Sequence, residues 1–139
     1  MADHIVIAVD PGREKCGIAA VDQQRGALVR QVIATSCLAE MVQEWAKMYR
    51  TTVVVLGSRT SSKEARLLLQ GMKTEAGPLS VVLVEEHRST EEARLRYWRE
   101  FPPRGLWRLV PTSMRTPPVP VDDLVAVILA ERYFSADRK

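Results

Sequence analysis

The chain has 139 residues, of which 46% are hydrophobic and 27% are charged, with a formal net charge of +3. This length supports one ordinary hydrophobic core, so we expect a single globular domain over residues 1–139. No apolar run approaches the roughly 20 residues of a transmembrane helix, and the N-terminus lacks a secretory pattern. We therefore expect a cytoplasmic protein with no membrane association.

The basic balance permits nucleic-acid binding without requiring it, because many soluble proteins carry a similar charge. Its distribution is more informative. Residues 101–121 contain three arginines, no acidic residue and six of the chain's eight prolines, which predicts a proline-rich basic loop over residues 102–120. Cys16 and Cys37 have no metal-ligand spacing, so we expect buried or half-buried free thiols.

The first predicted element is a buried strand over residues 5–9, which ends at Asp10 and a Pro-Gly turn. A second apolar run starts at Gly17 and a third spans residues 27–34, and such short connections predict an antiparallel meander of three strands. On these residues alone, Asp10 is either a turn residue or a ligand for a hard cation.

The rest of the chain alternates between helical and strand patterns. Helix caps, apolar stripes and β-branched runs predict the following elements in order: a helix capped by Ser36 and extending to Tyr49, a strand over residues 51–57, a helix opened by a capping box at 61–64 and ending near Gly77, a strand over residues 80–84, a helix opened by a capping box at 89–92, and a final helix over residues 124–134. Strands separated by helices should be parallel. The expected fold class is therefore α/β, with a mixed five-stranded sheet of a three-strand antiparallel meander plus two parallel strands and helices on both faces.

Acidic residues follow the parallel strands and open the final helix. Asp10 and Glu86 come at the carboxyl ends of strands, where sites form in such sheets, and Asp122 and Asp123 precede the final helix. A carboxylate cluster suits Mg²⁺ or Mn²⁺, and two such ions would support phosphodiester hydrolysis. Alternatively, Asp122 and Asp123 stabilise the helix N-terminus, which we prefer for Asp123. The strand pattern does not choose between Glu85 and Glu86.

Three sequence blocks occur in order along nearly the whole chain: residues 10–19, residues 84–93, and residues 121–127 with Tyr133 and Phe134. As a set they resemble the YqgF/RuvX family of Holliday junction resolvases, which belongs to the ribonuclease H-like superfamily and is also linked to processing of ribosomal RNA precursors. The resemblance implies a ribonuclease H-like fold and a nuclease that acts on structured DNA or RNA. A monomer and a homodimer both stay open, although a symmetric cut of a four-way junction needs two active sites.

Residue by residue, the resemblance implies catalytic, metal-binding acids at Asp10, Glu86 and Asp122, with Mg²⁺ or Mn²⁺ as the cofactor. It selects Glu86 over Glu85 and leaves Asp123 as a candidate fourth ligand. The chain departs from the family at two places. His87 replaces the family's arginine after the glutamate, and the loop at residues 56–60 lacks the usual Asp-Gly.

These departures motivate an alternative function, a nucleic-acid-binding module with a degenerate nuclease site. Phosphotransfer of the sugar-kinase and actin kind shares the Asp-x-Gly opening, but it needs two domains, which this length does not supply.

Basic residues after the fourth and fifth predicted strands and in the proline-rich loop are candidates for phosphate contacts, and binding through them should weaken steeply with salt. The candidates are Arg59, Lys63, Arg88, Arg104 and Arg108. The alternative is that they belong to solvated helix faces with local glutamate partners. Trp107 either stacks on a base or is buried beneath its own loop.

Overall fold

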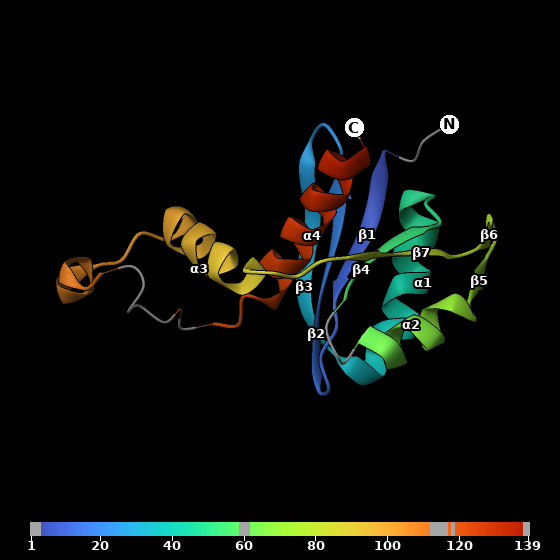
Figure 1. Ribbon diagram of the computed structural model, residues 1–139, viewed down its shortest axis with the longest axis horizontal. Helices are drawn as coiled ribbons and strands as arrows, with labels where there is room; N and C mark the ends of the chain where they lie inside the picture. Colours follow the sequence, from blue (N-terminus) through green and yellow to red (C-terminus); the bar gives the residue numbers. More distant parts are fainter. Residues whose placement is uncertain (1–3, 59–61, 112–116, 118, 138–139) are drawn as a thin grey trace.

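A five-stranded sheet forms the centre of the protein in this computed structural model, which describes residues 4–58, 62–111, 117 and 119–137 (Figure 1). The strand order is β3-β2-β1-β4-β7. The strands are β1 (Ile5–Asp10), β2 (Lys15–Asp22), β3 (Gly26–Ala34), β4 (Val53–Gly57) and β7 (Ser80–Val84). β1, β2 and β3 are antiparallel neighbours, whereas β4 and β7 run parallel to β1. This confirms the predicted meander with two parallel strands.

Helices cover both faces of the sheet, as predicted. The helix α4 (Asp122–Asp137) packs on one face, and α1 (Leu38–Tyr49) and α2 (Ser62–Gln70) pack on the other. Alternate residues of β1 enter the two cores, because successive side chains of a strand point to opposite faces. Val6 and Ala8 are buried against α4, while Ile7 and Val9 are buried on the face of α1 and α2.

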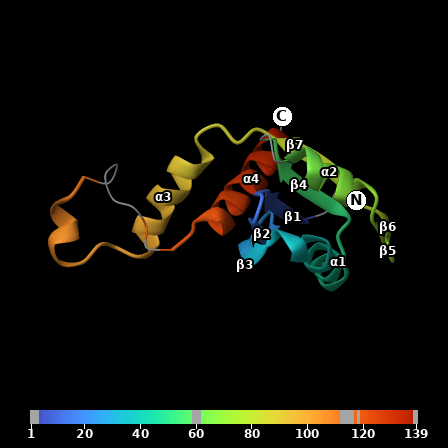
Figure 2. The same ribbon diagram turned by 90° about the horizontal axis from the view of Figure 1, so that it is seen from below.

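The helix α3 (Ser89–Glu100) packs on α4, with Ala93 buried in the same core cluster. Beyond it lies a 3₁₀ turn, η2 (Gly105–Leu109). Figure 2 shows α3 and the segment that follows it projecting away from the sheet. Leu106 and Leu109 of this segment are each 82% exposed. Among the described residues, no helix is long and apolar enough to cross a membrane.

Two predicted helix caps are wrong. Ser36 lies inside a 3₁₀ turn, η1 (Thr35–Cys37), and the N-cap of α1 is Cys37, which makes no side-chain cap. Ser89 is the first residue of α3 rather than its cap, since Arg88 takes the N-cap position. Cys37 is also exposed, contrary to expectation, whereas Cys16 is buried and both thiols are free.

The helix α2 ends earlier than predicted, at Gln70. The residues after it form a short hairpin of β5 (Lys73–Thr74) and β6 (Gly77–Pro78). Gly77 has a φ of 123°, and the Thr74 hydroxyl donates to its carbonyl at 2.9 Å. This local turn ends the helical pattern before the glycine and proline that were expected to end it.

Candidate active site

Asp10 ends β1 at the centre of the sheet and is 8% exposed. It pairs directly with Gly17 on β2. On its other side, the register of β1 with β4 places Gly57 next to it. Side chains of directly opposed residues lie on one face, so a side chain at either glycine would share the face of Asp10. This is the face covered by α4, because Asp10 alternates with Val9 in the opposite core.

The two glycines leave space for the two other predicted acids. A Cβ on Gly17 would lie 1.9 Å from the backbone oxygen of Asp122. A Cβ on Gly57 would lie 2.3 Å from Cδ of Glu86. Since neighbouring strands are about 4.8 Å apart, Asp122 and the Glu86 carboxyl group each lie roughly one strand spacing from Asp10. The structure therefore brings Asp10, Glu86 and Asp122 to one face of the sheet at the carboxyl end of its central strand, and we call these three residues the acidic edge.

Asp10 and Glu86 are buried, which makes their charged carboxylates costly unless a cation or hydrogen bonds compensate them. Glu86 is only 3% exposed. The donor set of carboxylate oxygens fits Mg²⁺ or Mn²⁺ rather than a softer metal. Among the described residues, however, no three His, Cys, Asp or Glu side chains already form a metal-ligand cluster. The acids thus line one edge with Asp10 in the middle, rather than closing on one point.

The loop after Asp10 is fixed by Thr35, the first residue after β3. The Thr35 amide donates to the carbonyl of Glu14 at 2.8 Å, and the Thr35 hydroxyl donates to the carbonyl of Gly12 at 2.9 Å. Buried Cys16 places its sulfur 3.3 Å from the same hydroxyl. These contacts hold the β1–β2 connection, and with it the end of the strand that carries Asp10.

Asp123 has contacts of its own. One carboxylate oxygen accepts from the Leu124 amide at 2.9 Å, and the other lies 3.2 Å from Nε of Arg30 on β3. The same guanidinium makes two hydrogen bonds to Glu100, which hold the pKa of Glu100 below its usual value. These contacts support the preferred role of Asp123 at the start of α4, while its metal ligation stays a prediction. Nothing in the sequence pattern singles out Arg30 beyond its place in a predicted strand.

The predicted phosphate-binding residues are spread widely. Arg88 and Lys63 are exposed, on the turn after Glu86 and on α2 respectively. Arg104 and Arg108 are exposed on the segment beyond α3, which the structure does not bring to the acidic edge (Figure 1). Arg59 and the side chain of Trp107 lie outside the described part of the chain.

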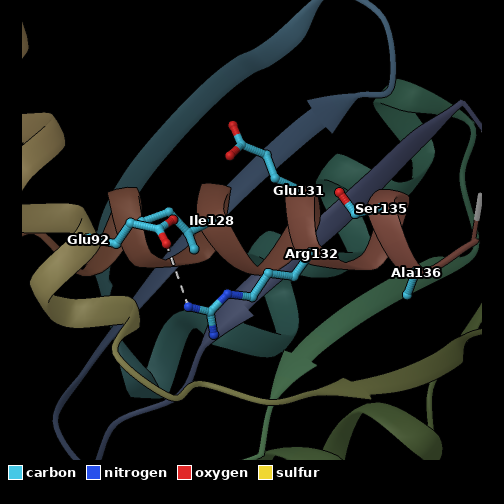
Figure 3. Close-up of a pocket in the computed structure, with 6 residues that line it drawn as sticks. All are labelled: Glu92, Ile128, Glu131, Arg132, Ser135 and Ala136. Atoms are coloured by element: carbon cyan, nitrogen blue, oxygen red, sulfur yellow. Dashed lines mark ion pairs between the residues drawn. The ribbon is translucent and has the colours of Figure 1, made fainter.

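A cavity of about 390 Å³ lies along the outer side of α4 (Figure 3). Its lining consists of Glu92, Ile128, Glu131, Arg132, Ser135 and Ala136. It includes none of Asp10, Glu86 and Asp122, so it is separate from the acidic edge.

No protein-family model matches the chain, and no curated protein matches it. Solved structures do share its architecture. RuvC of Thermus thermophilus in complex with a Holliday junction substrate aligns with a TM-score of 0.61 at 15% identity, over 96% of this chain and 95% of that chain. Fowlpox virus resolvase in complex with substrate Holliday junction DNA aligns with a TM-score of 0.61 at 12% identity, over 97% of this chain and 99% of that chain.

The chain has a ribonuclease H-like fold. This agrees with the fold that the sequence blocks imply. In this fold, Asp10 lies at the end of the central strand. Asp122 approaches it from the start of α4, and Glu86 approaches it from the turn after β7.

Proposed function

We propose that this protein is a metal-dependent nuclease of the YqgF/RuvX kind that hydrolyses phosphodiester bonds in structured nucleic acid. The observation that carries the proposal is that Asp10, the Glu86 carboxyl group and the backbone of Asp122 lie on one face of the sheet at the end of β1, with Glu86 packed over Gly57 and Asp122 over Gly17. The similar structures of RuvC and the fowlpox resolvase, both in complex with Holliday junctions, support the substrate class.

Asp10, Glu86 and Asp122 would hold Mg²⁺ or Mn²⁺, which would supply an activated water and stabilise the leaving oxygen. Asp10 is suited to the central position because its strand is hydrogen-bonded on both sides. Glu86 is itself covered from solvent. Arg88 is exposed two residues after Glu86, and in this proposal it would bind a phosphate of the nucleic-acid strand. Arg104 and Arg108 would contact nucleic acid further from the cleavage point.

Metal dependence is the direct test of this function. Purified protein should cleave a four-way DNA junction or a structured RNA in Mg²⁺ or Mn²⁺, and a chelator should abolish cleavage. Comparing both substrates with a linear duplex separates junction resolution from RNA processing. Cleavage that persists in chelator would contradict the proposal. Salt-sensitive binding without cleavage in any divalent metal would instead favour a binding module with a degenerate site.

Arg88 offers a test that separates binding from folding. It has a left-handed backbone, with φ 57° and ψ 14°, which costs a non-glycine residue about 1–2 kcal/mol. We expect Arg88→Gly to unfold at the same or a higher temperature than the wild type, because glycine adopts this conformation freely. The same variant should bind nucleic acid more weakly and lose about one unit of the salt-dependence slope.

Arg50→Gly is the matched control for this measurement. Arg50 is exposed and also left-handed, with φ 54° and ψ 47°, but it ends α1 on the other face of the sheet. Its substitution should affect stability similarly and leave binding unchanged. An equal loss of binding in both variants would show that Arg88 acts only through the net charge.

A further inference from the structure

The turn that carries Glu86 begins where the pairing of the sheet stops. β7 is an edge strand, and its register with β4 ends at the pair of Gly57 and Val84. The Ser58 amide adds one bond to the carbonyl of Val84 at 3.1 Å. Glu86 follows two residues later, so the sheet alone does not fix its position. Contacts from outside the sheet must hold the turn.

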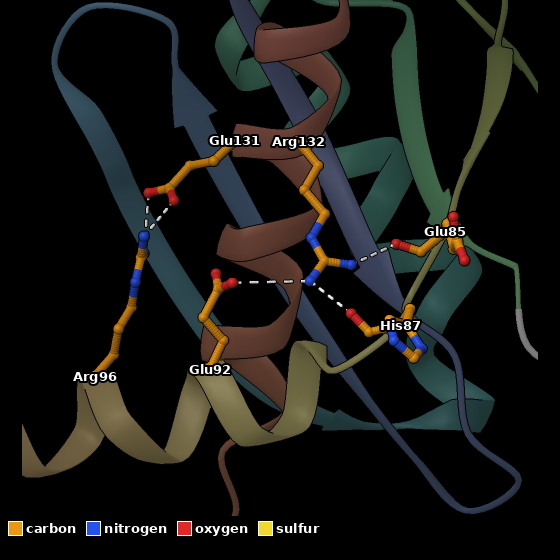
Figure 4. A network of polar contacts seen from close by, with 6 residues as sticks. All are labelled: Glu85, His87, Glu92, Arg96, Glu131 and Arg132. Atoms are coloured by element: carbon orange, nitrogen blue, oxygen red, sulfur yellow. Dashed lines mark hydrogen bonds and ion pairs between the residues drawn. The ribbon is translucent and has the colours of Figure 1, made fainter.

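Arg132 of α4 supplies such contacts (Figure 4). One terminal nitrogen of its guanidinium donates to the carbonyl of Glu85, and the other donates to the carbonyl of His87, both at 2.7 Å. These are the carbonyls on either side of Glu86. The planar guanidinium presents two donors in a fixed geometry, which a lysine ammonium does not reproduce. The carboxylate of Glu92 on α3 lies 3.8 Å from the same guanidinium and forms an ion pair with it.

The helix that provides Arg132 also provides Asp122. Asp122 begins α4 and lies over Gly17, on one side of Asp10. Further along the same helix, Arg132 holds the turn from which Glu86 reaches Gly57, on the other side of Asp10. The helix α4 therefore sets the position of Glu86 relative to Asp122.

We propose that Arg132 is a positioning residue for Glu86: it holds both carbonyls that flank this residue and so fixes its carboxylate at the acidic edge. The inference rests on the proposed function only in that Glu86 binds metal. Residues that orient metal ligands typically contribute 10- to 100-fold to metal affinity or activity, even though they do not touch the metal.

A neighbouring ion pair provides a matched control. Arg96 of α3 makes two hydrogen bonds to Glu131, the residue before Arg132 (Figure 4). This pair also joins α3 to α4 and also involves an arginine, but it does not contact the turn around Glu86. Arg96→Gln therefore removes the same charge from the same interface without releasing the carbonyls of Glu85 and His87.

The test compares Arg132→Gln, Arg132→Lys and Arg96→Gln by Mn²⁺ affinity and by hydrogen exchange in chelator. Both Arg132 variants should bind Mn²⁺ about 10- to 100-fold more weakly than the wild type. They should also exchange the Ser89 amide faster, because this amide donates to the carbonyl of Glu86 at 2.9 Å. Arg96→Gln should change Mn²⁺ affinity less than twofold and leave Ser89 protected. Amides of β4 should exchange equally slowly in every variant, which shows that the sheet is intact.

The two readouts separate this inference from the proposed function. If the wild type binds no Mn²⁺, the proposed function fails, and the hydrogen exchange at Ser89 alone decides whether Arg132 holds the turn. If the wild type binds Mn²⁺ but Arg132→Gln and Arg96→Gln lower the Mn²⁺ affinity equally, Arg132 only joins two helices and the inference is overturned. Unchanged protection of Ser89 in both Arg132 variants overturns it as well.

Discussion

Asp10→Asn is expected to reduce metal-dependent cleavage by about 10³-fold. A bound metal ion contributes several kcal/mol to lowering the activation barrier, and losing a contribution of this size slows the reaction by about this factor. Asparagine has nearly the same size and keeps one oxygen, but it lacks the charge that attracts a divalent cation. Because Asp10 lies between the positions of Glu86 and Asp122, its replacement would weaken binding of any metal ion that these acids hold. The fold should persist, because the volume of the side chain is conserved.

Asp22→Asn is the control for this prediction. Asp22 is also a buried acid at a strand end, but one of its oxygens accepts the amides of Gln24 and Arg25 at 2.8 and 3.0 Å. These hydrogen bonds lower the pKa of Asp22, so it stabilises the turn in its charged form. Asp22→Asn should therefore reduce thermal stability and leave cleavage unchanged. Wild-type cleavage rates in Asp10→Asn, measured on a branched DNA and a structured RNA, would remove Asp10 from the mechanism.

The sheet could be predicted from the sequence because short stretches of neighbouring residues determine its strands and their connections. Runs of β-branched residues mark the strands, and the short connections around the first three require an antiparallel meander. The positions of Asp10 and Glu86 at strand ends follow from the same runs. The end of α2 was harder to predict, because the short pairing of β5 with β6 replaces the last part of the helical pattern.

The supporting contacts could not be predicted, because they join residues far apart in sequence. Arg132 contacts carbonyls 47 and 45 residues away, and Arg30 contacts Glu100 across 70 residues. Nothing in the local pattern distinguishes these arginines from exposed ones. The position of the segment with Arg104 and Arg108 could not be predicted from the sequence either, because it depends on α3, which carries that segment away from the sheet.

The glycines beside Asp10 give the second large prediction. In Gly57→Ala, the new Cβ would lie 2.3 Å from Cδ of Glu86, the far end of a flexible side chain. The side chain can move, so we expect a stability loss of about 1–3 kcal/mol, as for other overpacked sites. The carboxylate, however, is displaced from the edge. A shift of about 1 Å can cost 100-fold in rate, so cleavage and Mn²⁺ affinity should fall by about that factor.

Gly17→Ala should fail in a different way. Its Cβ would meet the backbone oxygen of Asp122 at 1.9 Å and the backbone nitrogen of Asp123 at 2.7 Å. Backbone cannot move aside as a side chain can, so the start of α4 must shift with the core that it buries, and we expect the larger loss of stability.

Gly71→Ala provides the baseline, since its Cβ would meet only ordinary contacts at 3.7 Å. Chemical denaturation and Mn²⁺ binding of the three variants distinguish their effects. If Glu86 is a ligand, Gly57→Ala loses metal affinity out of proportion to its stability, while Gly17→Ala loses mainly stability. Gly57→Ala with wild-type Mn²⁺ affinity would mean that the carboxyl group beside this glycine does not bind the metal, and the acidic edge would then consist of Asp10 and Asp122 alone.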